Sequence, residues 1–434
     1  MIPEIEKKSK EEIKQLQEEK LQELLLYIST KSPFYKKLFK ENSIDISTIK
    51  KLEDLPKIPV TTKEDLQQCN DEFFCVDKSK IIDYVTTSGT TGKPVFFGLT
   101  DKDLDRLAYN EAISFACSQV TCADTIQLMT TIDRRFMAGL AYFLGARKLS
   151  AGIIRVGGGI PELQWDSILK FKPTYLIAVP SFLLKLIEFA EKNNINQNES
   201  SVKGVICIGE PLKNQDFSLN VLSNKIKEKW NIELYSTYAS TEMGTAFAEC
   251  EHQIGGHQHP ELIITEILDD NDQLVENGRE GELVITTLGV EGMPLLRFKT
   301  GDIVKAHHES CDCGRNTMRL GPVVGRKKQM IKYKGTTIYP PAMYNLLNDF
   351  PEIKNYIIEI DENEIGTDKI TIKLGAKESS DELITNIKDH FRAKLRVAPE
   401  LEFVSISEIY KLQFPKMSRK PMLFIDKRKS YVSE

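Results

Sequence analysis

The feature that most constrains the fold is an alternation of short apolar runs with helical patterns between residues 125 and 210. The four apolar runs are Ile126–Met129, Ile153–Val156, Tyr175–Val179 and Val205–Ile208. An order of strand, helix and strand forms βαβ units, in which neighbouring strands lie parallel in one sheet. The sequence therefore predicts an α/β fold, with parallel sheets and helices in a large N-terminal domain.

A β-rich part is expected after this region. Residues 261–305 switch to strand-like runs that are separated by tight turns. The expected strands are Leu262–Leu268, Glu282–Thr286 and Leu295–Phe298. We expect this subdomain to belong to the large domain.

The ends of the chain carry different patterns. Residues 4–41 have helical spacing that is broken at Pro33, and Asp101–Phe115 also reads as a helix. Residues beyond 328 carry their own strand and helix patterns, which fit a small, mobile α+β domain. We therefore expect a large domain over residues 1–327 and a small one over 328–434.

Composition excludes several classes of protein. The 434 residues are 41% hydrophobic and 28% charged, which fits a globular protein with a large core. A net charge of -5 gives no reason to expect a nucleic-acid partner. No run has the length of a membrane span, and the first residues lack the apolar core of a signal peptide. Five scattered cysteines without a disulfide framework indicate a cytoplasmic protein: Cys69, Cys75, Cys117, Cys122 and Cys207.

Residues 86–94 read Thr-Thr-Ser-Gly-Thr-Thr-Gly-Lys-Pro. Backbone N–H groups, hydroxyls and one ammonium in such a loop can surround an anion, and phosphate is the usual one. The run is not a P-loop, because that motif has Ser or Thr after its lysine and here Pro94 follows Lys93. The β-branched and aromatic run Val95–Leu99 indicates that the loop joins two strands. A surface turn rich in hydroxyl groups is the alternative.

Further blocks follow this loop in a fixed order. They are Ile208–Pro211, Ser236–Glu242, Arg297–Asp302, Gly325–Lys328 and Pro415–Arg428. Loop and blocks together resemble the adenylate-forming enzymes, and most closely their phenylacetate–CoA ligase branch, over nearly the full length of the chain. The resemblance implies a two-step ligase that uses ATP, Mg²⁺ and CoA.

The resemblance also implies roles at a bound nucleotide. The nucleotide-binding residues would be Thr87, Ser88, Gly89, Thr90, Thr91, Gly92, Lys93, Gly209, Glu210, Pro211, Tyr238, Ala239, Ser240, Asp302 and Arg326. The turn Gly209–Pro211 would lie beside the adenine, beyond the carboxyl end of a parallel strand. Asp302 would accept hydrogen bonds from both ribose hydroxyls, and Arg326 would reach ribose or phosphate.

The block around Tyr238 would carry part of the chemistry. Tyr238 would offer its ring to the adenosine, and Thr241 its hydroxyl to the α-phosphate. Glu242 would hold Mg²⁺, which binds one or two carboxylates together with phosphate oxygens. Ala239 replaces the glycine that the family usually has there. A helix-capping pair is the alternative for Thr241 and Glu242.

By the same resemblance, the C-terminal blocks would provide the hinge of the small domain, the CoA channel and the catalytic lysine. Lys328 takes the hinge position, which the nearest branch usually fills with Asp. Gly335 and Tyr339 would line the channel for the CoA thiol. Lys420 aligns with the catalytic lysine, although Arg419 and Pro421 replace the usual small neighbours. Lys416 and Arg419 therefore stay rivals, and a solvated basic tail is the alternative.

Position in the family places the acid pocket at residues 133–139, with Arg135, Phe136, Ala138 and Gly139 as its lining. The nearest relatives have an aromatic, uncharged stretch there. Arg134 and Arg135 could face a second carboxylate of the substrate, or lie at the surface in an ion pair. The sequence does not decide which acid is used.

A zinc site is expected within residues 245–325. Cys311 and Cys313 are one residue apart, and Cys250 is the third thiol expected. Three thiolates and one imidazole make a closed, structural tetrahedral set. Related ligases favour His257 as the fourth ligand, while His259 and His252 stay open. Buried free thiols are the alternative.

Three functions remain in view. The first is the acid–CoA ligase. The second is an adenylating enzyme that passes the acyl group to a carrier-protein thiol or an amine. The third is a non-catalytic binding module stabilised by zinc. Relatives in the family also suggest a homodimer.

Overall fold

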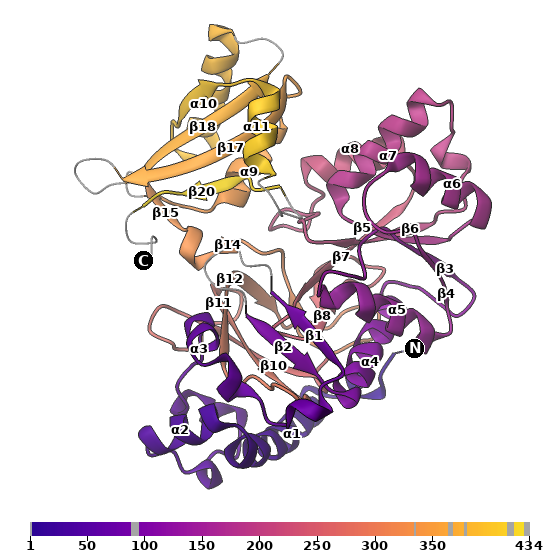
Figure 1. The fold of residues 1–434 in the computed structure, drawn as a ribbon. Helices are drawn as coiled ribbons and strands as arrows, with labels where there is room; N and C mark the ends of the chain where they lie inside the picture. The colour runs from indigo at the N-terminus through magenta and orange to yellow at the C-terminus, as the bar shows by residue number, and fades with distance from the viewer. Residues whose placement is uncertain are drawn as a thin grey trace. The chain divides into compact units, whose positions relative to one another are not determined.

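The computed structural model describes residues 2–87, 95–333, 336–362, 368–376, 380–414 and 421–428. The chain forms two compact units, Met1–Val323 and Val324–Glu434. Figure 1 shows helices and a large sheet in the first unit, and a smaller sheet with helices in the second. The division after residue 327 stays a prediction.

The first unit begins with two consecutive helices, α1 (Lys10–Lys31) and α2 (Pro33–Glu41). Ser9 caps α1 in a capping box with Glu12, so that each side chain bonds the other's backbone N–H. Ser32 ends α1 and caps α2, and Pro33 takes the first position of α2, where no N–H donor is needed. The break expected at Pro33 is therefore the start of a second helix.

The remaining helices of the first unit lie along the chain between its strands. They are α3 (Lys63–Gln68), α4 (Asp101–Cys117), α5 (Met137–Leu149), α6 (Pro161–Phe171), α7 (Pro180–Lys192) and α8 (Val221–Lys229). Short 3-10 helices are η1 (Glu4–Lys7), η2 (Ile46–Thr48), η3 (Leu52–Lys57), η4 (Asn70–Phe73), η5 (Lys78–Lys80) and η6 (Gln197–Glu199). Within the described parts of the chain, no helix has the length and apolar character needed to cross a bilayer.

One large mixed sheet organises this unit, in the order β10-β11-β12-β13-β9-β8-β7-β6-β5-β3-β4. Its strands are β3 (Thr125–Leu128), β4 (Gly152–Arg155), β5 (Tyr175–Ala178), β6 (Gly204–Ile208), β7 (Glu233–Ser240), β8 (Thr245–Ala248), β9 (Gly256–His257), β10 (Ile263–Leu268), β11 (Glu280–Thr287), β12 (Phe298–His307) and β13 (Arg319–Leu320). Strands β4, β3, β5, β6 and β7 are parallel, and the others pair antiparallel. The α/β fold expected from the sequence is confirmed.

Alternate residues of the parallel strands face different helices. On β5, Leu176 and Ala178 belong to a core cluster with side chains of α6, α7 and α8. Tyr175 and Ile177 of the same strand belong to a cluster with side chains of α4 and α5. The period of two along a strand thus gives a sheet with both faces covered, which Figure 1 shows around β5 and β6.

The strand expected at Leu295–Phe298 is wrong in its first three residues. Strand β12 begins only at Phe298. Arg297 has a φ of 48°, in the left-handed region that a strand cannot contain. Its buried guanidinium donates to both carboxylate oxygens of Glu266, at 3.0 and 2.8 Å. The sequence pattern does not reveal this buried ion pair. It is formed by the residue at which the backbone turns, so the strand begins one residue later.

The second unit is an α+β structure, as expected. Its helices are α9 (Pro340–Asn348), α10 (Asp381–Leu395), α11 (Ile406–Gln413) and the 3-10 helix η7 (Lys327–Gln329). Its strands are β14 (Gly325–Arg326), β15 (Ile331–Tyr333), β16 (Thr336–Ile338), β17 (Ile353–Glu362), β18 (Asp368–Ala376), β19 (Glu400–Phe403) and β20 (Phe424–Asp426). One sheet has the order β19-β18-β17-β20, and β15 pairs with β16. Ile358, Ile372 and Phe391 lie in its core, each at 0% exposure.

Glu111 is a buried carboxyl group between α4 and α5. A Cβ atom at Gly145 of α5 would collide with the Glu111 side chain, so the two helices approach closely here. Asn110 donates to Glu111 Oε1 at 3.1 Å. Burial raises the pKa of Glu111 to about 8, because a carboxylate is poorly solvated there.

We expect Glu111→Gln to be more stable than the wild type at pH 8 and similar to it at pH 5. From the ordinary pKa up to about 8, the unfolded chain ionises Glu111 while the folded chain keeps the proton, so the wild-type free energy of unfolding falls as pH rises. The difference at pH 8 should be roughly 3–5 kcal/mol. Urea unfolding followed by tryptophan fluorescence measures it, since the two tryptophans, Trp165 and Trp230, stack inside the first unit.

The control is Glu228→Gln, which makes the same change at an exposed position of α8. That variant should keep the wild-type pH profile. Equal pH profiles for Glu111→Gln and the wild type would contradict the prediction.

Candidate active site and metal centre

Two paired strands flank the predicted phosphate loop. Strands β1 (Asp83–Thr86) and β2 (Phe96–Leu99) are antiparallel, as expected for a loop between two strands. Thr87 N donates to Val95 O at 3.0 Å and closes the base of the loop. Thr87 Oγ1 is buried and has no hydrogen-bond partner among the described residues. The other predicted loop residues lie outside the described residues: Ser88, Gly89, Thr90, Thr91, Gly92 and Lys93.

The turn predicted to lie beside adenine follows β6 directly. Gly209 has a φ of 77°, a conformation that favours glycine, and it ends the strand. The Glu210 carboxylate accepts hydrogen bonds from Ser181 N and Ser181 Oγ, both at 2.8 Å. Ser181 lies in the first turn of α7, so Glu210 caps that helix. Pro211 follows at the exposed side of the turn.

Tyr238 and Asp302 are 64 residues apart in sequence and meet in the fold. Tyr238 OH donates to Asp302 Oδ2 at 2.7 Å. Tyr238, Ala239 and Ser240 form the end of β7, beside the end of β6 that leads into Gly209. Asp302 lies on β12, directly after Gly301, whose φ is 78°. The hydrogen bond joins the end of β7 to β12.

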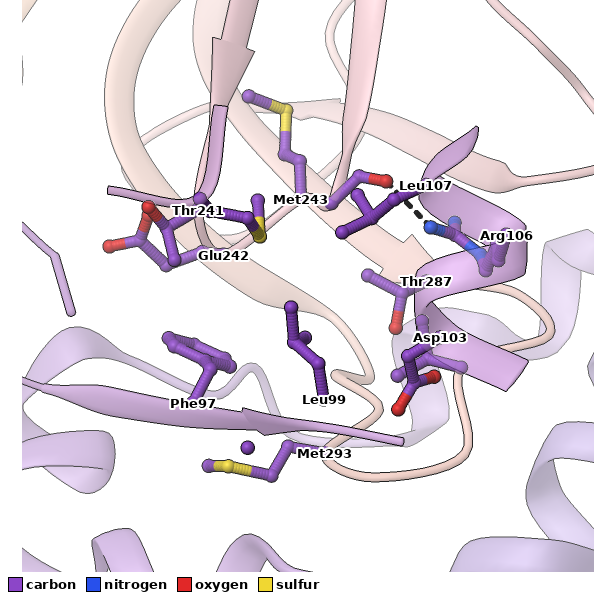
Figure 2. A pocket seen from close by; sticks show the side chains of 14 residues that line it. Phe97, Leu99, Asp103, Arg106, Leu107, Thr241, Glu242, Met243, Thr287 and Met293 are labelled. Carbon is purple, nitrogen blue, oxygen red and sulfur yellow. Dashed lines mark hydrogen bonds between the residues drawn. The ribbon is translucent and has the colours of Figure 1, made fainter. Parts of the chain in front are cut away.

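Thr241 and Glu242 lie in the turn between β7 and β8, at residues 241–244. They border a small cavity of about 30 Å³, shown in Figure 2. Its lining is Phe97, Gly98, Leu99, Asp103, Arg106, Leu107, Met137, Thr241, Glu242, Met243, Gly244, Thr287, Val290 and Met293. Phe97 and Leu99 come from β2, so the hairpin that carries the phosphate loop reaches the same cavity as Thr241 and Glu242.

The residues predicted for the acid pocket are not in this lining. Arg135 is exposed, Phe136 and Ala138 are half-buried, and Gly139 is buried against the backbone of Thr131. Their neighbour Met137 does line the cavity. Sequence reasoning also missed Asp103 and Arg106, which are buried on α4. Two charged residues three apart on the buried face of an apolar helix would have been the signal.

The remaining predicted residues belong to the second unit. Arg326 on β14 and Lys328 in η7 are exposed. Arg428 donates to Met330 O at 2.9 Å and pairs with Asp368 at 3.1 Å, so the segment after Lys328 is fastened to this unit. The Tyr339 ring packs against Gly325, where a Cβ atom would collide with it. Gly335 and Lys420 lie outside the described residues, as do the rivals Lys416 and Arg419.

Cys250, His257, Cys311 and Cys313 form a cluster whose ligand atoms all lie within 4.8 Å of one another. Cys250 Sγ and Cys311 Sγ are 3.7 Å apart, and Cys313 Sγ is 3.5 Å from His257 Nε2. A tetrahedral zinc ion with Zn–S bonds of about 2.3 Å places neighbouring sulfurs about 3.8 Å apart. The four residues therefore fit Zn²⁺ in donor type and spacing.

The surrounding contacts fit the same set of ligands. His257 Nδ1 is 3.0 Å from Thr317 Oγ1, which leaves Nε2 toward the thiols. Hydrogen bonds from Cys250, His257 and Arg315 lower the pKa of the Cys313 thiol. His259 instead contacts Glu6 at 2.6 Å and Ser114 at 3.2 Å, and His252 is exposed.

Comparisons with known proteins agree with this architecture. A family model for AMP-binding enzymes matches residues 8–292. The phenylacetate-coenzyme A ligase of Thermus thermophilus is 30% identical over 385 residues, covering 87% of this chain and 84% of that relative. The Escherichia coli phenylacetate-coenzyme A ligase is 28% identical over 389 residues, covering 87% of this chain and 85% of its own.

Solved structures share the fold. A crystal structure of 2-hydroxyisobutyryl-CoA ligase in the postadenylation state has a TM-score of 0.83 at 23% identity, covering 99% of this chain and 92% of its own. Fold and relatives define the class of this protein, an adenylate-forming enzyme. The chain belongs to the AMP-binding enzyme family, and its resemblance to the phenylacetate–CoA ligase branch is confirmed.

Proposed function

We propose that this chain is an ATP-dependent acid–CoA ligase. It activates a carboxylic acid as acyl-AMP with release of pyrophosphate, and then transfers the acyl group to the CoA thiol. The family and the relatives named above support this reaction class. The observation that carries the proposal is the approach of Tyr238 to Asp302, at the sheet end where β7 leads into Thr241 and Glu242.

In the first half-reaction, a carboxylate oxygen of the acid attacks the α-phosphorus of ATP, and pyrophosphate leaves. Asp302 binds the ribose and, through Tyr238 OH, orients the ring that borders the adenosine. Thr241 donates its hydroxyl to an α-phosphate oxygen. Glu242 would hold Mg²⁺, which supplies positive charge to the phosphate oxygens when bound. Thr87, whose buried hydroxyl has no hydrogen-bond partner among the residues that the structure describes, would contribute from the base of the loop to binding of the outer phosphates.

In the second half-reaction, the CoA thiol attacks the acyl carbonyl and AMP leaves. The two steps need different groups at one carbonyl, so the small domain must change its position between them. We infer that Lys328 is the pivot, and that Gly335 and Tyr339 line the path of the thiol. Arg428 donates to Met330 O at 2.9 Å and to Lys328 O at 3.5 Å, so the chain is held to the second unit from the Lys328 carbonyl onward, which supports a pivot at the backbone of Lys328.

We propose that the acid is a monocarboxylate with an apolar group. The cavity beside Thr241 has apolar walls from Phe97, Leu99, Leu107, Met137, Met243, Val290 and Met293. Among its described lining residues the cation is Arg106, and its N–H groups already bond four protein acceptors. The three methionines can move aside for a larger group, because their side chains are unbranched and flexible. Arg135 lies exposed instead of facing this cavity.

A screen of acids tests this proposal. Aryl, aliphatic and dicarboxylic acids are compared for acid-dependent pyrophosphate release with ATP, with and without CoA. We expect aryl or other apolar monocarboxylates to give the highest rates, and a CoA thioester to form. Release of AMP without a thioester would move the acceptor to a carrier-protein thiol or an amine. No pyrophosphate release with any acid would contradict adenylation itself.

We further propose that Zn²⁺ is a structural ion held by Cys250, His257, Cys311 and Cys313. A set of four protein ligands leaves no open position for a substrate, so the ion would stabilise the loop at residues 311–315. None of the eight cysteines forms a disulfide, which supports a reducing compartment such as the cytoplasm.

A further inference from the structure

Arg106 on α4 is a buried cation held by backbone groups. Its side chain donates to Leu288 O at 2.7 Å, Gly244 O at 2.6 Å, Thr245 Oγ1 at 3.0 Å and Leu262 O at 2.7 Å. Among the described residues, none of its hydrogen bonds goes to a carboxylate. Burial lowers the pKa of Arg106 to about 10, because the charge has lost its water. Because burying a guanidinium without a carboxylate partner is energetically unfavourable, we looked for the structural role of its hydrogen bonds.

Two of the four acceptors belong to the segment that carries Thr241 and Glu242. Gly244 closes the turn 241–244 with a φ of 53°, and Thr245 starts β8. Figure 2 shows Arg106 on one side of the pocket and Thr241 and Glu242 on the other, and a dashed line marks a hydrogen bond of Arg106. Asn110, one helical turn later on α4, accepts from Ala246 N at 3.0 Å. Helix α4 is therefore hydrogen-bonded to the β7–β8 hairpin from two successive turns of the helix.

The other two acceptors join this hairpin to the β-rich part of the unit. Leu262 precedes β10 and Leu288 follows β11, and Leu288 N donates to Leu262 O at 2.9 Å. One turn earlier on α4, Asp103 accepts from Glu291 N at 2.7 Å and Gly292 N at 2.9 Å. Arg106 thus links the turn that ends at Gly244 to two other segments, at Leu262 and at Leu288, which are distant from the turn and from each other in sequence.

We propose that Arg106 is a positioning residue for adenylation, which fixes the 241–244 turn so that Thr241 and Glu242 keep the spacing that the α-phosphate and Mg²⁺ require. This inference rests on the proposed function of that turn. A planar guanidinium has five donors in a fixed fork and can serve acceptors on several sides at once. Lysine has three donors around one nitrogen atom, so it cannot span the same acceptors. Replacement of Arg106 should therefore loosen the turn, while Thr241 and Glu242 themselves stay in place.

The test uses the full-length Arg106→Lys variant and acid-dependent ATP–pyrophosphate exchange, titrated with Mg²⁺ at saturating ATP. A displacement of about 1 Å at a reacting centre can cost 10²-fold in rate, so we expect kcat for exchange to fall roughly 10- to 100-fold. The Mg²⁺ concentration at half-maximal rate should rise roughly tenfold, by the same reasoning. Thioester formation from supplied acyl-AMP should fall less than exchange does, since it needs neither ATP nor Glu242-bound metal and keeps only the Thr241 contact with the phosphate.

Thr245→Val serves as a second variant if Arg106→Lys folds poorly. It removes one acceptor, keeps the shape of the side chain and leaves Arg106 in place, so a smaller shift in the same direction is expected. Leu186→Ala is the control for general destabilisation, because Leu186 is fully buried in the cluster around α7, away from the cavity lining. It should lower the melting temperature and leave the Mg²⁺ dependence unchanged.

The design distinguishes failure of the positioning role from failure of the proposed function. Wild-type Mg²⁺ dependence and kcat in both Arg106→Lys and Thr245→Val, with only stability reduced, would overturn the positioning role. Absence of exchange in the wild type with every acid would instead overturn the proposed function.

Discussion

Lys420→Ala is expected to reduce acid-dependent ATP–pyrophosphate exchange by roughly 10²–10³-fold, the usual effect of removing one group that stabilises transition-state charge. The Lys420 ammonium is proposed to lie between the attacking carboxylate and the α-phosphate, where negative charge gathers as the oxygen–phosphorus bond forms and the bond to pyrophosphate breaks. The thiol step needs no such group, so thioester formation from supplied acyl-AMP should be spared. Measuring both half-reactions on one preparation separates this role from a loss of folding.

Lys416→Ala and Arg419→Ala are the matched controls, because both residues lie in the same basic block and were rivals for the role. Each should keep exchange within a few-fold of the wild type. A large loss in one of them, with Lys420→Ala active, would transfer the assignment to that residue. Equal loss of both half-reactions in Lys420→Ala would remove the proposed role.

Cys250→Ser is expected to lose the bound metal and a large part of the stability of the first unit. In the wild type we expect one zinc ion per chain by elemental analysis, and less than a tenth of that in the variant. Three ligands bind a structural zinc much more weakly than four, and the binding free energy of such an ion contributes directly to folding. The free energy of unfolding should therefore fall by several kcal/mol, measured by urea unfolding.

Cys117→Ser is the control for this substitution. Cys117 is buried in the same small cluster, but its thiol donates to Ala248 O at 3.3 Å, a bond that serine can also make. This variant should keep its zinc. A wild-type protein without zinc, folded and unaffected by chelators, would contradict the metal centre and favour the alternative of free thiols.

Local order along the chain was accessible from the sequence. The four apolar runs between residues 125 and 210 became β3, β4, β5 and β6. Strands β5 and β6 are buried along their whole length, and such strands need continuous apolar residues, whereas β4 is a partly exposed strand at the sheet edge. Asp101–Phe115 became α4, since Thr100 and Asp103 form a capping box at its start. The β1–β2 hairpin around the phosphate loop followed from the β-branched run after Pro94.

The relations between distant segments were decided by the tertiary structure. The sequence named Tyr238 and Asp302 separately, and only the packing of β7 and β12 in one unit brings the hydroxyl to within 2.7 Å of the carboxylate. His257 was favoured over His259 by family resemblance, and the fold places the first beside three thiols and the second beside Glu6.

Arg106 illustrates why contacts between distant segments could not be predicted from the sequence. By itself the sequence determined the family, the order of strands and helices, and most residue types of the site, because periodicity, caps and motifs are written in neighbouring residues. Only the tertiary structure decided which polar groups meet, where β12 begins and what lines the cavity. The buried guanidinium of Arg106 donates to acceptors in segments more than a hundred residues away, and a local sequence pattern carries no information about which distant segments come together.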